Sequence, residues 1–169
     1  MIYRPTRRLQ AKIKVHDLET IALEEDVWGD WSARLFVVAR HQFLLLSHTA
    51  TLYSVVVPAR GATNGEMFAA LAGYSIAMFM GIDRLSPVFR KHIEPQLTTT
   101  RFAKAYSRSI TGSMNDLEYA ARVYLESGEL LIPEVSQRLN DTPMTAIGTP
   151  ETHGYARPRD ALVGLAEKS

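Results

Sequence analysis

Four side chains that lie close together in the sequence have the chemistry to bind nucleic acid. Arg101, Lys104 and Arg108 are cations that can hold phosphate groups, and Tyr106 offers a ring on which a base can stack. If residues 102–110 are extended, alternation places Lys104, Tyr106 and Arg108 on one face of a strand. Three further cations could extend this face if the N-terminal segment lies nearby: Arg7, Arg8 and Lys12. The alternative is an ordinary solvated strand face.

A second candidate is the glycine-containing turn at Thr111, Gly112 and Ser113, because a helix N-terminus can bind an anion. We expect Ser113 to cap a helix that ends near Gly128, with Asp116 in its first turn. That carboxylate would oppose a second anion. The pattern therefore favours self-capping over phosphate binding.

A hydrolytic triad could be composed from Asp30, His48 and Ser113, but the sequence lacks a nucleophile elbow that would position them. We interpret Asp30 as part of a turn, His48 as a strand end and Ser113 as a helix cap. No catalytic residue is assigned, and an uncharacterised hydrolase ranks third among the candidate functions.

The histidines do not form a metal-binding pattern. His16, His41, His48, His92 and His153 are scattered, and no pair has the helical spacing with an acid that a compact zinc site uses. The chain also has no cysteine, which excludes disulfides, thiolate ligands and thiol nucleophiles. We therefore predict neither a metal nor a cofactor.

The sequence patterns of the helices and strands that must position these residues predict an α+β fold. Residues 1–5 can form a strand and residues 7–14 a short amphipathic helix. An acidic connection at 17–30 precedes three β-rich runs within residues 32–59, which are typical of an antiparallel meander. We expect a small antiparallel sheet, the meander plus additional strands, packed with about four helices.

The most apolar segment, residues 67–81, is shorter than the roughly 20 residues that cross a bilayer, so we interpret it as a buried helix and expect no membrane association. A capping box at Thr63 to Glu66 marks its start. Its large apolar side chains favour the core, with self-association as the alternative. They are Met67, Phe68, Leu71, Met78, Phe79 and Met80.

The C-terminal region is rich in proline and glycine. We predict one α+β domain over residues 1–140 and a linker-like tail over 141–169 that can end in a short docking helix. The apolar residues of that helix are candidates for binding a partner: Leu162, Val163 and Leu165.

Composition adds little about partners, since 19 lysines and arginines nearly balance 18 acids. Basic residues interrupt the apolar ones near the N-terminus, which argues against a signal peptide. We expect a cytoplasmic protein.

The chain resembles an uncharacterised bacterial domain family, often of plasmid or other mobile-element origin. The matching features are Trp28 to Trp31, the sheet region from Leu35 to Pro58, and the Gly-Ser-Met-Asn-Asp segment within Arg108 to Leu117. The resemblance covers about residues 1–139. It implies an α+β domain and brings no activity, cofactor or catalytic residue.

The sequence therefore favours a non-enzymatic interaction or regulatory module that binds a protein partner or itself. A nucleic-acid-binding accessory factor is the alternative.

Overall fold

A computed structural model describes residues 1–23 and 27–169, so part of the acidic connection predicted at 17–30 lies outside the described residues. Five strands form one mixed sheet in the order β4-β3-β2-β1-β5. The antiparallel β2-β3-β4 meander confirms the prediction, whereas β1 runs parallel to both of its neighbours. The strands are β1 (Ile2–Pro5), β2 (Asp30–Val38), β3 (His41–His48), β4 (Ser54–Pro58) and β5 (Arg101–Phe102).

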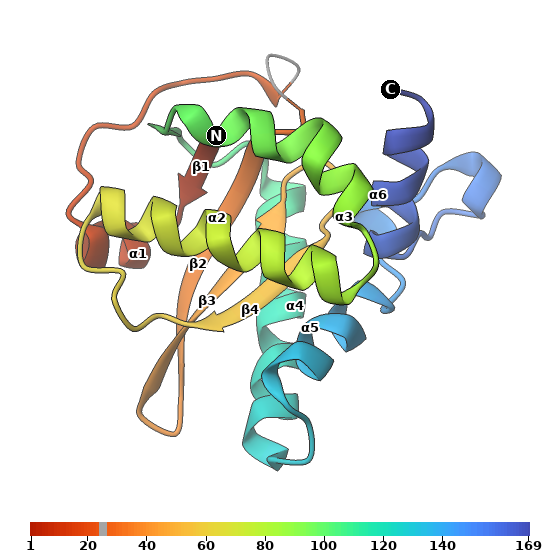
Figure 1. Ribbon diagram of the computed structural model, residues 1–169. Coiled ribbons are helices and arrows are strands. Elements are labelled where there is room, and N and C mark those ends of the chain that lie inside the picture. Colours follow the sequence, from red (N-terminus) through yellow and green to blue (C-terminus); the bar gives the residue numbers. More distant parts are fainter. Residues whose placement is uncertain (24–26) are drawn as a thin grey trace.

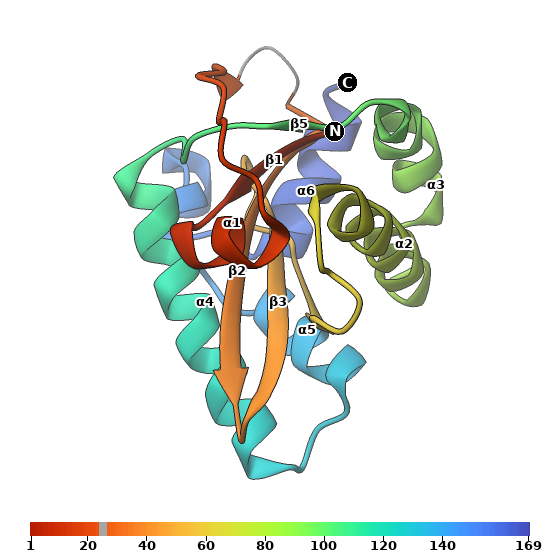
Figure 2. The same cartoon turned by 90° about the vertical axis from the view of Figure 1, so that its left-hand side faces the viewer.

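Helices cover both faces of the sheet (Figures 1 and 2). Alternate residues of β2 divide between two cores, with Trp31 and Leu35 in one and Phe36 in the other. The first core includes residues of α1 (Arg7–Ile13), α2 (Gly65–Ile82) and α6 (Pro158–Glu167). The second includes residues of α4 (Arg108–Ser127) and α5 (Ile132–Asn140). Burial on both sides explains the unbroken apolar runs in β3 and β4.

The cap of α2 lies one residue later than predicted, because the Asn64 side chain accepts from the Met67 amide at 2.9 Å. Beyond α2 the chain turns through α3 (Ser86–Val88), a π-helical turn (Phe89–Ile93) and a 3-10 turn (Glu94–Thr98). By length and composition α2 could cross a membrane, but its buried residues pack on the sheet as part of the first core. It is a core helix with one open face.

The predicted strand through residues 102–110 is wrong. β5 ends at Phe102, and α4 begins at Arg108, where the extended Ser107 caps the helix by accepting from the Ile110 amide at 3.2 Å. The helical spacing of apolar residues explains the difference, because it begins before Ser113, the residue that was expected to cap the helix. Ile110 and Met114 join Leu117 in the second core.

The C-terminal region packs on the sheet domain. A bridge between Met144 and Ala156 closes two 3-10 turns, Thr145–Ile147 and Pro150–Thr152, before α6 begins. Arg159 of α6 forms an ion pair with Asp83 at 2.9 Å, and the same carboxylate accepts from Tyr53 at 2.6 Å. The network attaches α6 to the end of α2.

Candidate functional site

A cationic pocket of about 360 Å³ lies between the α4 side of the sheet and the segment that leads into α4. β1 and β2 supply Arg4 and Arg34, and the first turn of α1 supplies Arg7. Lys104 and Tyr106 come from the connection between β5 and α4. The described residues that line the pocket include no acid.

Arg4, which lines the pocket, is held in a buried ion pair. Arg4 Nε donates to Asp30 Oδ1 at 2.8 Å, and Arg4 Nη2 contacts Oδ2 at 2.6 Å. Further Arg4 donors reach the carbonyls of Ile21 at 2.8 Å and Lys104 at 2.7 Å. These bonds fix Arg4 and anchor Lys104 beside it.

Arg34 forms the wall toward α4. Its Nη1 donates to Asn115 and, at 3.0 Å, to Glu118 Oε2, and its side chain is 11% exposed. Glu118 is shared with Arg122, whose Nη2 lies 2.6 Å from Oε1. Two other polar atoms at this pocket are buried and find no hydrogen-bond partner in residues 1–23 and 27–169: Arg34 Nε and Thr6 Oγ1.

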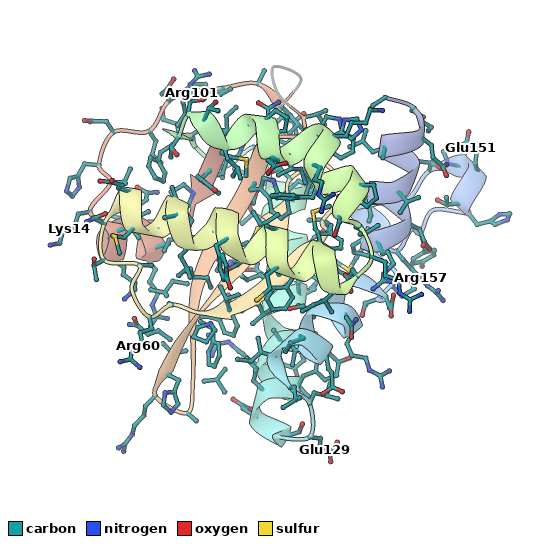
Figure 3. The ribbon with its side chains drawn as sticks, viewed as in Figure 1. Lys14, Arg60, Arg101, Glu129, Glu151 and Arg157 are labelled. Carbon is teal, nitrogen blue, oxygen red and sulfur yellow. The ribbon has the colours of Figure 1, made fainter. Side chains whose placement is uncertain are left out.

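The structure brings together only some of the predicted nucleic-acid residues. Lys104, Tyr106 and Arg7 share the pocket, and Arg108 lines an adjoining hollow with Tyr106. Arg101 lies apart, at the upper edge of the molecule in Figure 3, with its Nη2 2.5 Å from Glu19 Oε2. Two others do not line the pocket: Arg8 is exposed, and Lys12 donates to Gln42 at 2.8 Å.

Sequence reasoning missed Arg4 and Arg34. The available signal was a charged residue within an apolar strand pattern, in IYRP and SARLF. A charge at such a position is costly unless it is paired, which makes it a candidate for a structured polar site.

The Asp116 carboxylate does not oppose an anion at the start of α4, contrary to the expectation from the sequence. Because the helix begins at Arg108, Ser113 lies within it and does not cap it, and Asp116 lies more than two turns from the start. The first turn of α4 contains no acid.

Two residues of the possible hydrolytic triad have separate partners, and the third lies within a helix. Asp30 is not a turn residue as expected but begins β2 and holds Arg4. His48 ends β3 as predicted, and its Nδ1 lies 2.8 Å from Thr51 Oγ1. Burial lowers the pKa of His48 to about 4, so the ring is neutral at pH 7. Ser113 is a buried residue of α4.

The three C-terminal residues that were predicted to bind a partner pack in or against the first core. Leu162 is fully buried there, and Val163 and Leu165 pack against it while partly buried. Their predicted role in binding a partner stays a prediction.

An apolar stripe runs along the open face of α2. Phe68, Phe79 and Met80 of the predicted set are buried, and Leu71 is half-buried. The exposed members are spaced by helical turns: Met67, Tyr74, Met78 and Ile82. Tyr74 is 70% exposed.

A larger pocket of about 660 Å³ adjoins this α2 stripe. Its α2 side is lined by small residues, among them Ala69, Ala70 and Gly73, and Tyr74 stands at its rim. Leu97 and Phe102 line it from the chain that leads to β5. A hollow and a projecting ring therefore lie side by side on one helix.

The family model for a domain of unknown function, DUF6933, matches residues 2–161. Among curated proteins, none matches this chain. The matched stretch runs from β1 into α6, beyond the 1–139 that the resemblance was expected to cover. Because the match spans nearly all of the sequence, the chain belongs to the DUF6933 family, a domain of unknown function.

Proposed function

We propose that this protein is a non-enzymatic interaction module that pairs with a second copy of itself through the open face of α2. The observation that carries the proposal is the exposed α2 stripe beside its pocket. Only one charged residue, Glu66, occurs along this 18-residue helix. Exposed apolar surface of this kind is typical of protein interfaces.

A second copy fits this surface because the surface is self-complementary. In a two-fold pairing each subunit presents the same patch. The patch must therefore contain both a projecting group and a hollow that receives the same group of the other copy. Tyr74 would enter the hollow beside Ala70 and Gly73 of the other copy, while its own hollow receives the other Tyr74. Buried tyrosine anchors of this kind dominate the binding energy of many interfaces.

Sedimentation equilibrium tests this proposal, with Tyr74→Ser as the interface variant. Tyr119 on α4 is 71% exposed, so Tyr119→Ser is a closely matched control. We expect the natural chain and Tyr119→Ser to sediment with twice the mass of one chain, and Tyr74→Ser to shift toward a single chain. A natural chain that stays monomeric at high micromolar concentration would overturn the proposal.

Nucleic-acid binding is the second candidate, because the cationic pocket gathers Lys104, Tyr106 and Arg7 of the predicted set. Its affinity should fall steeply with salt, since each neutralised phosphate releases counterions. Fluorescence anisotropy with single- and double-stranded oligonucleotides at low salt tests it, and an absence of binding there rejects it.

The setting of either function is also a proposal. We infer a cytoplasmic protein, with which the lack of cysteine is compatible. The bacterial and mobile-element origin implied by the resemblance stays a prediction.

A further inference from the structure

We propose that the cationic pocket binds the terminal 5′-phosphate of a nucleotide, with Tyr106 packing against the base. This inference deepens the second candidate function, because it concerns the same face of the protein. It is narrower, since it requires one phosphate in one pocket rather than contacts along a strand.

Charge is the first reason. Four cations line the pocket, and the described lining residues include no acid: Arg4, Arg7, Arg34 and Lys104. Asp30 and Glu118 neutralise Arg4 and Arg34 from behind. Arg7 and Lys104 are exposed and add positive charge at the mouth. An anion is the ligand that this lining favours.

Two buried polar atoms are the second reason. Among the described residues, Arg34 Nε and Thr6 Oγ1 have no hydrogen-bond partner, although buried polar groups in folded proteins are nearly always paired. A buried polar atom without a hydrogen bond lowers the stability of the folded protein. Both side chains line the pocket, so a small movement of either on binding would let an acceptor oxygen of a phosphate group take its hydrogen bond.

The start of α4 adds to the positive electrostatic potential of the pocket. Thr111 and Ile110 line the pocket one turn into this 20-residue helix, and no acid lies in that turn. The positive end of the helix dipole therefore faces an anion without competition from a carboxylate.

The remaining lining suits an apolar ring. Tyr106 is 41% exposed, and the Arg4 guanidinium lies 5.7 Å from its ring centroid, which holds the tyrosine beside Arg4. Leu18, Ile110 and Met114 provide apolar surface beside it. A volume of about 360 Å³ lies within the range of small-molecule pockets, which begins at about 300 Å³.

Calorimetry with adenosine monophosphate, inorganic phosphate and adenosine tests the pocket directly. The informative variants are Thr6→Val, which removes the hydroxyl at nearly constant shape, and Arg34→Lys, which keeps the charge but loses Nε. Arg60→Ala is the control, because Arg60, labelled at the lower left in Figure 3, is exposed and lines a different hollow. We expect adenosine monophosphate to bind more tightly than phosphate, and adenosine to bind least.

Each pocket variant should weaken adenosine monophosphate binding on the order of tenfold, the effect of one lost charge-assisted hydrogen bond. Arg60→Ala should not change it. Thr6→Val should also leave the Tm of the free protein unchanged or higher, because the Thr6 hydroxyl has no hydrogen-bond partner in the part of the chain that the structure describes. A purely structural threonine would show a lower Tm and unchanged binding, and that outcome overturns the assignment.

Oligonucleotides with and without a 5′-phosphate identify the source of the phosphate. Tighter binding of the phosphorylated strand than of adenosine monophosphate assigns the pocket to a strand end, and equal binding assigns it to a free nucleotide. If oligonucleotides bind equally with and without the phosphate and adenosine monophosphate does not bind, the pocket proposal fails while nucleic-acid binding stands. If no phosphorylated probe binds, the pocket proposal fails as well.

Discussion

Arg4 and Asp30 join the parallel strands β1 and β2 through a buried ion pair, with Arg4 Nη2 2.6 Å from Asp30 Oδ2. In the strand register Asp30 stands opposite Ile2, so Arg4 reaches two residues back along β2 on the same face of the sheet. The pair fixes the N-terminal strand and holds Arg4 in the lining of the cationic pocket.

Replacing one member of this pair should be far more damaging than replacing both. Arg4→Met leaves the Asp30 carboxylate buried without its partner, and we expect it to lower the free energy of unfolding by about 3–5 kcal/mol. The double variant Arg4→Met, Asp30→Leu should recover much of that loss. Urea denaturation of the natural chain, Arg4→Met, Asp30→Leu and the double variant measures both effects, and losses that simply add in the double variant would contradict the coupling.

Gly112→Ala should stabilise the protein by about 1 kcal/mol, because Gly112 lies within α4 and alanine is the better helix former. A Cβ atom at this position meets nothing within 4 Å. Gly128→Ala is the contrasting control, since its φ of +68° disfavours a side chain. Thermal denaturation compares the two. Destabilisation by Gly112→Ala would instead support the predicted turn at this position.

His48 should make stability depend on pH. Burial lowers the pKa of His48 from 6.5 to about 4 in the folded state, so between these values the unfolded chain takes up a proton that the folded protein does not. The contribution of His48 to the free energy of unfolding is fully present above pH 6.5 and is lost as the pH is lowered toward 4. The slope is roughly 1.4 kcal/mol per pH unit, or ~3 kcal/mol in all.

Urea denaturation between pH 7 and pH 5 separates this effect from the titration of ordinary carboxylates. His48→Gln should flatten the slope, whereas replacing the exposed His16 with glutamine should keep it. A slope that survives in His48→Gln would assign it to another group.

Leu162→Ala tests whether α6 belongs to the folded domain. Because Leu162 is fully buried in the first core, its truncation should lower the free energy of unfolding by about 2–5 kcal/mol. Exposed Leu131 provides the control, since Leu131→Ala removes the same atoms outside the core. Equal and small effects would show a tail that is only loosely attached.

The local pattern predicted much of the fold. Alternating and continuous apolar runs gave the meander, and the apolar period with Gly128 gave the end of α4. The start of α4 was misplaced because Ser107 and Ser113 are both suitable caps, and only packing of Ile110 on the sheet decides between them.

The candidate site was harder to predict because its residues meet only through tertiary structure. The parallel pairing of β1 with β2 places Arg4 beside Asp30 and Arg34, and no local pattern specifies that pairing. Lys104 and Tyr106 were identified from their chemistry, but the strand that was expected to align them does not form.

Cross-linking at Ala70 tests the central claim, self-association through α2, most directly. Ala70 is exposed beside Tyr74, and because the chain has no cysteine, Ala70→Cys carries a single thiol. With a short thiol-to-thiol cross-linker at low micromolar concentration, we expect a covalent dimer that disappears when Tyr74→Ser is added. Ala105→Cys, exposed at the cationic pocket, should give none. Equal cross-linking at both positions, or none at Ala70→Cys, would contradict the account.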